Sequence, residues 1–148
     1  MKFYESGDNR KPVIFLFPGT CCQYSSFDHV LDGLHSYFYT VAVSYDGFDS
    51  NEKTEFYSME DECEKIEQEI RTKYGGRIKA AYGCSLGGSF VSLLIQRKRI
   101  HIGAVAVGEP FAAKTVNTVV FERIAAAVIG AVVGEIVGGP HGLCVRAG

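Results

Sequence analysis

The sequence has no tryptophan and no surplus of positive charge. Its 148 residues carry 15 Lys and Arg against 17 Asp and Glu, which gives a net charge of −2. A protein that binds nucleic acid needs basic residues to neutralise phosphates, so we expect no nucleic-acid partner. The basic cluster Arg97-Lys98-Arg99 follows a predicted helix, where cations are favoured in any case.

Long apolar runs and paired cysteine motifs are also missing. The longest apolar stretch, residues 124–134, is shorter than the ~20 residues that a membrane-spanning helix needs. The N-terminus reaches charge before any apolar run, so we expect neither a secretory signal nor an integral membrane segment. The five cysteines form no C-x-x-C pair and have no histidine at zinc-finger spacing. We therefore expect no metal, no cofactor and a cytoplasmic location.

Buried-strand patterns alternate with helical patterns over residues 11–108. Apolar runs predict strands, at 13–17, 40–45, 78–82 and 102–107. Apolar residues at helical spacing predict three helices, which fall between these strands. This alternation predicts an α/β fold, with a mostly parallel sheet and helices on both faces. In such folds ligands bind at the carboxyl ends of the strands, so chemistry is expected in the turns after Phe17, Tyr45, Tyr82 and Val107.

Capping residues predict where the first two helices begin. Ser25 with Asp28, and Ser58 with Asp61, each match the spacing of an N-terminal cap. The second helix is predicted to end at Gly75-Gly76, and its acid-rich face is expected to lie in solvent.

Composition divides the chain into two parts. Residues 1–110 are predicted to form the α/β core, and residues 111–148 form a Gly- and Ala-rich segment with little charge. Glycine recurs there every four residues, at positions 130, 134 and 138. That spacing permits close helix packing, in membranes especially. Because Glu135 interrupts a short apolar stretch, a terminal helix or a tail is favoured over a membrane role.

One five-residue motif carries the chemistry. Gly83-Cys84-Ser85-Leu86-Gly87 matches G-x-S-x-G, and it lies between a predicted strand and a predicted helix, as a nucleophile elbow requires. Ser85 at the apex is the candidate nucleophile, and the backbone N–H of Leu86 is a candidate oxyanion donor. The alternatives are a serine that only forms a turn, and a nucleophilic Cys84, which we expect to be a small packing residue instead.

With these motifs, residues 11–108 resemble the N-terminal half of an α/β-hydrolase. The resemblance implies a second oxyanion donor in the loop after the first predicted strand, where Pro18 stands in place of the histidine usual in that family. Carried over to this sequence, the donor is the backbone N–H of Thr20, with Cys21 next. Cys21 and its neighbour Cys22 are expected to pack in this loop rather than to form a redox pair.

A serine nucleophile also needs a base and an acid to orient that base. The family order places both after Ser85, where there is no Asp at all. His101 begins the last predicted strand, far from the elbow, which leaves His141. Glu109 follows that strand at its carboxyl end. The predicted triad is therefore Ser85, Glu109 and His141.

These residues predict a serine hydrolase that cleaves a small-molecule ester, thioester or amide through an acyl-serine intermediate. The alternative is a truncated, catalytically inactive fragment that binds a partner or self-associates through an exposed sheet edge. The alternative follows from the residues after Gly108, which lack the pattern of the two further strands that carry the acid and base in the family.

Overall fold

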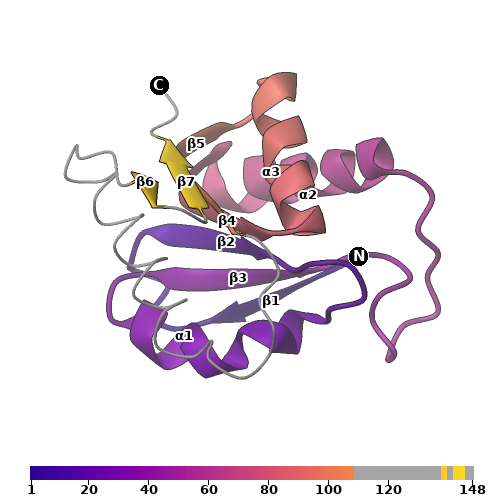
Figure 1. The fold of residues 1–148 in the computed structure, drawn as a ribbon, viewed down its shortest axis with the longest axis horizontal. Helices are drawn as coiled ribbons and strands as arrows, with labels where there is room; N and C mark the ends of the chain where they lie inside the picture. The colour runs from indigo at the N-terminus through magenta and orange to yellow at the C-terminus, as the bar shows by residue number, and fades with distance from the viewer. Residues whose placement is uncertain (109–137, 140–141, 146–148) are drawn as a thin grey trace.

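A single seven-stranded sheet organises the chain, in the order β1-β3-β2-β4-β5-β7-β6 (Figure 1). The computed structural model describes residues 1–108, 138–139 and 142–145. The strands are β1 (Lys2–Ser6), β2 (Val13–Phe17), β3 (Tyr39–Ser44), β4 (Arg77–Cys84), β5 (His101–Gly108), β6 (Gly138–Gly139) and β7 (Gly142–Val145). The helices are η1 (Tyr24–Phe27), α1 (Asp28–His35), α2 (Met59–Tyr74) and α3 (Leu86–Arg97).

The four central strands β3, β2, β4 and β5 run parallel to one another. Helix α1 covers one face of the sheet, and α2 and α3 cover the other (Figure 1). The predicted α/β class, with a mostly parallel sheet and helices on both faces, is confirmed.

Strand β2 shows why this sheet needs a helical layer on each face. Successive side chains of a strand point to opposite faces, and all of its last four residues are apolar and fully buried. Ile14 and Leu16 belong to the core beneath α1, while Phe15 and Phe17 belong to the core beneath α2 and α3. An uninterrupted apolar run therefore places this strand at the centre of the molecule.

The two predicted helix caps have different outcomes. Ser58 caps α2 as predicted, because its hydroxyl accepts a hydrogen bond from the Asp61 N–H at 3.1 Å, and α2 ends at Gly75 with a φ of 61°. The predicted cap at Ser25 is wrong. Ser25 lies inside the 3-10 helix η1, and α1 begins only at Asp28, without a side-chain cap.

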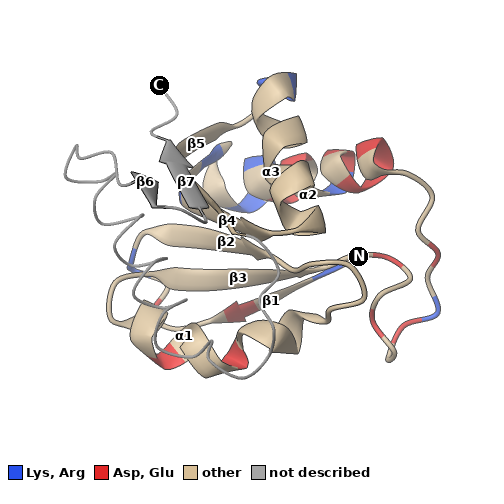
Figure 2. Ribbon diagram, in the orientation of Figure 1, with Lys and Arg blue, Asp and Glu red and all other residues tan. Residues whose placement is uncertain are grey.

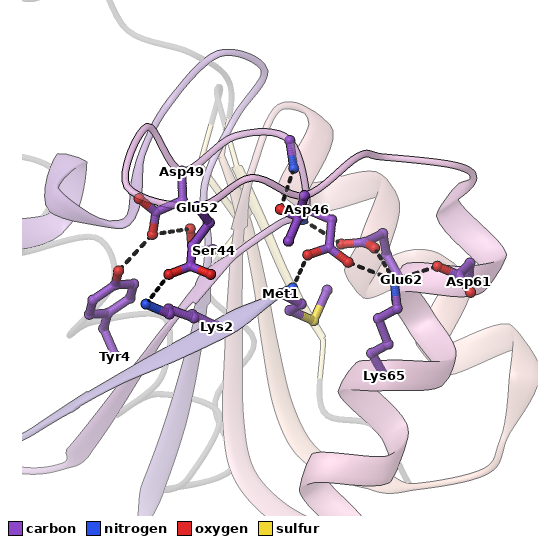
Figure 3. A network of polar contacts seen from close by, with 12 residues as sticks. Met1, Lys2, Tyr4, Ser44, Asp46, Asp49, Glu52, Asp61, Glu62 and Lys65 are labelled. Carbon is purple, nitrogen blue, oxygen red and sulfur yellow. Dashed lines mark hydrogen bonds and ion pairs between the residues drawn. The ribbon is translucent and has the colours of Figure 1, made fainter.

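The expectation that the acidic face of α2 lies wholly in solvent is also wrong. Figure 2 shows charges of both signs along α2, and two of its carboxylates, Glu62 and Glu67, are fully buried. Glu62 accepts a hydrogen bond from the Asp46 N–H at 3.0 Å and pairs with Lys65 at 2.9 Å (Figure 3). Lys65 also contacts Asp46 at 2.7 Å, so this group fastens the chain after β3 to α2.

Glu67 forms the contact between α2 and α3. The Arg97 guanidinium donates to both of its carboxylate oxygens, at 2.6 and 3.2 Å, in a two-pronged arrangement. Such pairs are stronger than single contacts because two charge-assisted hydrogen bonds share one geometry. The carboxylate raises the pKa of Arg97, which lies at the end of α3.

The sheet is wider than the sequence patterns predict. Strand β1 pairs antiparallel with β3, and β7 pairs antiparallel with β5. The first of these strands, Lys-Phe-Tyr-Glu-Ser, has polar residues on both sides of two aromatic residues, so it lacks the apolar run of the central strands. Within the C-terminal segment, where a helix or a tail is expected, residues 138–139 and 142–145 are strands of the same sheet. Gly130 and Gly134 lie outside the described residues.

Within the described ranges, no helix is both long and apolar enough to cross a membrane.

We predict that Arg97→Ala lowers the free energy of unfolding by about 3 kcal/mol, because it removes both Arg97 hydrogen bonds from the buried Glu67 carboxylate and leaves it only the longer contact with Arg99 at 3.5 Å beside that with Arg71. Urea denaturation measures this loss. The matched control is Arg71→Ala, whose guanidinium lies 3.9 Å from the same carboxylate on a half-exposed side chain. We expect the control to cost less than about 1 kcal/mol, and equal losses in the two variants would contradict the importance of the Arg97 contact.

Candidate active site

The candidate site lies where two neighbouring strands send the chain in opposite directions. Strand β2 pairs with β3 on one side and with β4 on the other. The chain leaves β2 for α1 and β3, and it leaves β4 for α3 and β5. A crevice forms outside the carboxyl ends of such strands, and ligands bind there in open α/β sheets. Phe17 and Gly83 are paired at this edge, so the loop after β2 and the elbow after β4 lie together.

Ser85 is the single residue between β4 and α3. It has a φ of 51° and a ψ of −113°, outside the regions that non-glycine residues ordinarily occupy. Neighbouring backbone groups hold this conformation. The Ser85 N–H donates to the Gly108 carbonyl at 3.0 Å, and the Ser85 carbonyl accepts from the Gly88 N–H at 2.9 Å. The serine is exposed, so the strained turn presents its side chain to solvent.

The Ser85 hydroxyl does not serve the helix that follows it. Ser85 occupies the N-cap position of α3, where a serine ordinarily accepts a hydrogen bond from the first turn, yet its side chain makes no cap hydrogen bond. Leu86 is the first residue of the helix, and N–H groups in the first turn have no partner within the helix. Within the described residues, the elbow thus combines a hydroxyl that does not cap the helix with an N–H group of Leu86 that donates to no other backbone group.

A glycine allows α3 to start this close to the sheet. A Cβ atom on Gly87 would collide with the backbone carbonyl of Phe17, the last residue of β2. The helix backbone therefore rests directly on the end of the neighbouring strand. Any larger residue at position 87 would push the elbow away from β2.

The loop after β2 contacts the elbow. A Cβ atom placed on Gly19 would lie 3.6 Å from the Ser85 Cβ and 3.4 Å from the Cys84 carbonyl oxygen. The loop closes in a turn in which the Cys22 N–H donates to the Gly19 carbonyl at 3.1 Å. Cys21, in the third position of the turn, has a φ of 59°. This left-handed conformation is strained for a residue other than glycine, and it makes the turn tight.

Thr20 and Cys21 lie exposed in the middle of that turn. Within the part of the chain that the structure describes, neither of their N–H groups donates a hydrogen bond to another backbone group. Both loops at this edge of the sheet therefore hold donors that a ligand could use. Cys84 packs against the core beneath α1, and burial raises the pKa of its thiol, as suits a packing residue.

The other predicted residues have separate outcomes. His101 lies at the start of β5, paired in register with Arg77, at the end of the sheet away from the elbow, as predicted. Glu109 and His141 lie outside the described residues.

The sequence patterns missed Tyr45. It follows β3 and is buried, and its hydroxyl donates to the Pro18 carbonyl at 3.2 Å. Its ring stacks on Phe90 of α3, with centroids 4.4 Å apart and planes 18° apart. The available signal was the position of Tyr45 at the carboxyl end of a predicted buried strand. A buried tyrosine hydroxyl usually forms a hydrogen bond, so a nearby acceptor is expected there.

No protein-family model and no curated protein sequence matches the chain.

Solved structures do match it, at low sequence identity. A protein assigned to the α/β-hydrolase family from Desulfitobacterium hafniense has a TM-score of 0.68 at 18% identity, over 94% of this chain and 57% of its own. A carboxylesterase from the thaumarchaeon Nitrososphaera gargenis has a TM-score of 0.60 at 18% identity, over 94% of this chain and 54% of its own.

The same fold also carries other chemistry. A 1H-3-hydroxy-4-oxoquinoline 2,4-dioxygenase matches with a TM-score of 0.56 at 19% identity, over 64% of this chain and 36% of its own. The chain thus spans about half of the two hydrolase structures and about a third of the dioxygenase. Identities this low relate folds, and function has to be argued from the site itself.

The structural match covers 94% of this chain, which has the parallel centre β3-β2-β4-β5 and the strand-elbow-helix unit at Ser85. Antiparallel strands flank this centre on both sides, with β1 beside β3 and β7 beside β5. The chain therefore resembles the α/β-hydrolases and has the fold of the structures that it matches.

Proposed function

We propose that the protein is a serine hydrolase that cleaves an ester, thioester or amide of a small molecule through an acyl intermediate on Ser85. One observation carries the proposal. Ser85 has a strained backbone, an exposed side chain and no capping hydrogen bond, although it occupies a helix N-cap. A serine that only formed a turn would gain stability from capping, so both the strain and the missing cap hydrogen bond favour a chemical role.

The neighbouring backbone supports acyl transfer. Attack by the hydroxyl on a carbonyl carbon puts negative charge on the carbonyl oxygen, which preorganised N–H donors stabilise. We assign this role to the N–H of Leu86, where the positive end of the α3 dipole adds to the effect, and to the N–H of Thr20, with Cys21 as the next choice. The contact of Gly19 with Ser85 supports a donor from this loop.

We assign His141 as the base and Glu109 as the acid that orients it. Both follow Ser85 in the sequence, in the order acid then base. Their described neighbours support the assignment. Gly108 pairs with Gly142 across β5 and β7, and the Gly108 carbonyl accepts the hydrogen bond of the Ser85 N–H. In the proposed reaction, His141 removes the hydroxyl proton as the bond between the Ser85 Oγ and the carbonyl carbon forms, and it returns the proton to the leaving group as the bond to that group breaks. Water then attacks the acyl-Ser85 carbonyl, loses a proton to His141 and releases the acid, while His141 returns that proton to the Ser85 Oγ.

An organophosphonate probe tests the nucleophile. The probe should label the wild-type protein once per chain, and Ser85→Ala should abolish both labelling and hydrolysis of an activated ester, with a loss of rate on the order of 10⁴-fold or more. Ser89→Ala, which removes an exposed hydroxyl one turn further along α3, is the matched control and should label normally. Labelling that persists in Ser85→Ala would refute the proposed nucleophile.

Two histidine variants test the base. His141→Ala should lower kcat for the activated ester on the order of 10³-fold or more, because the hydroxyl then lacks a proton acceptor. His101→Ala should leave kcat unchanged, since His101 lies at the other end of β5. If the two variants retained equal activity, His141 would not be the base, while the assignment of Ser85 would still stand on its labelling.

The alternative is a non-catalytic protein that binds a partner or self-associates through a sheet edge. It predicts no labelling of Ser85 and oligomers on size-exclusion chromatography. The charges on the edge strand β1 weigh against association there, because Lys2 pairs with Glu52 and Glu5 pairs with Lys73 on the same chain. We therefore favour the hydrolase.

A further inference from the structure

Tyr45 contacts the two segments that carry the proposed oxyanion donors. Its hydroxyl donates to the Pro18 carbonyl, one peptide before Gly19 and two residues before Thr20. Its ring stacks on Phe90, which lies one turn after Leu86 on α3. One side chain thus joins the loop after β2 to the helix that begins at the elbow. The proposed donors, the N–H groups of Thr20 and Leu86, belong to these two segments.

Tyr45 is itself held firmly. Its side chain is 1% exposed, and its ring also makes an edge-on contact with Phe48 at 5.6 Å. The next residue, Asp46, donates its N–H to the buried Glu62 carboxylate and pairs with Lys65 of α2 (Figure 3). The strand end that carries Tyr45 is therefore fixed to α2, while its ring is fixed against α3. A group fixed on two sides can hold a loop that has no regular structure of its own.

The hydroxyl is a dependable donor. Burial raises the pKa of Tyr45 above its ordinary value, so the phenol keeps its proton at neutral pH. The Pro18 carbonyl lies in a buried residue next to a tight turn. Losing its donor would leave a buried carbonyl without this hydrogen bond and would favour rotation of the Pro18–Gly19 peptide. Such a rotation would displace the N–H groups that follow it.

We propose that Tyr45 is a positioning residue that sets the oxyanion donor of the loop after β2 relative to Ser85. This inference rests on the proposed hydrolase function and adds a residue that the elbow motif does not contain. Tyr45 does not touch the reacting atoms in this proposal. It acts through Pro18 and Gly19, whose Cβ position lies 3.6 Å from the Ser85 Cβ.

The test is Tyr45→Phe, which removes the hydroxyl and keeps the ring on Phe90. We expect kcat for an activated ester to fall about 10- to 100-fold with KM unchanged, because the donor acts mainly in the transition state. Phosphonylation of Ser85 should slow in parallel. The matched control is Tyr74→Phe, which removes a hydroxyl bonded to Glu5 at 2.6 Å, at the other end of the sheet, and should leave kcat unchanged.

Two further measurements separate positioning from stability and from failure of the proposed function. Urea denaturation gives the folded fraction of each variant, and a fall in kcat no larger than the loss of folded protein would overturn the proposal. Backbone ¹⁵N relaxation should show lower order parameters for Gly19 and Thr20 in Tyr45→Phe than in Tyr74→Phe. If the wild-type protein neither hydrolyses the ester nor reacts with the probe, the hydrolase function fails. In that case the ¹⁵N relaxation measurement still tests whether Tyr45 positions the loop. Order parameters of Gly19 and Thr20 that are unchanged in Tyr45→Phe would refute the positioning role.

Discussion

The backbone contact between Gly87 and Phe17 is the constraint on which the candidate site depends. A helix normally stays away from a strand by the width of two side-chain layers, and here one of those layers is absent because position 87 has no Cβ. The start of α3 therefore lies on the end of β2. This contact brings Ser85 beside Gly19, and it brings Phe90, one turn after Leu86 in α3, against the ring of Tyr45.

The opposite end of α3 is fixed by charge. Arg97, the last residue of the helix, binds the buried Glu67 carboxylate of α2 through two hydrogen bonds. A helix fixed at one end could pivot, and a pivot would move the elbow relative to the loop after β2. With Gly87 near one end and Arg97 at the other, the direction of α3 is set. Loss of the ion pair should therefore loosen the packing beneath the elbow as well as lower stability.

Helix α2 fixes both α3 and the chain segment that follows β3. It holds two buried carboxylates, Glu62 and Glu67, and each has a different partner. Glu67 binds α3, whereas Glu62 binds the backbone and the lysine that fix Asp46 after β3. Burial of a carboxylate is costly unless it is paired and hydrogen-bonded, so these positions tolerate few substitutions. The acidic side of α2 thereby positions two of the segments around the candidate site.

The features that depend on neighbouring residues in the sequence were predictable. The apolar run of β2, the Ser58 cap and the strand-turn-helix at Ser85 each follow from a few adjacent residues. The features that depend on distant residues were not. The burial of Glu67 requires Arg97, thirty residues away, and the amphipathic pattern of α2 alone places it in solvent.

The same reasoning explains what was missed in the sheet and in the site. Strand β1 lies at the edge, where one flank is unpaired, and its short sequence has charged or polar residues at both ends, so it lacks the signal of a buried strand. Tyr45 is the last residue of the predicted strand 40–45 and follows β3 in the structure. Its proposed positioning role depends on the Pro18 carbonyl, 27 residues earlier in the chain. A motif defines the nucleophile, whereas the groups that position its surroundings come from other strands.

The fold by itself does not select a reaction, because one sheet can support unrelated chemistry. Backbone strain at a single residue, Ser85, indicates function more specifically than the fold does. A φ of 51° at Ser85 costs free energy that a glycine would avoid. Two backbone hydrogen bonds, from the Ser85 N–H to the Gly108 carbonyl and from the Gly88 N–H to the Ser85 carbonyl, hold this conformation together with the close approach at Gly87. If the position served only to join β4 to α3, glycine would make the same turn without that cost. The serine side chain occupies this strained position without capping α3. The strained conformation of Ser85 is therefore explained best by the proposed role of its hydroxyl as a nucleophile.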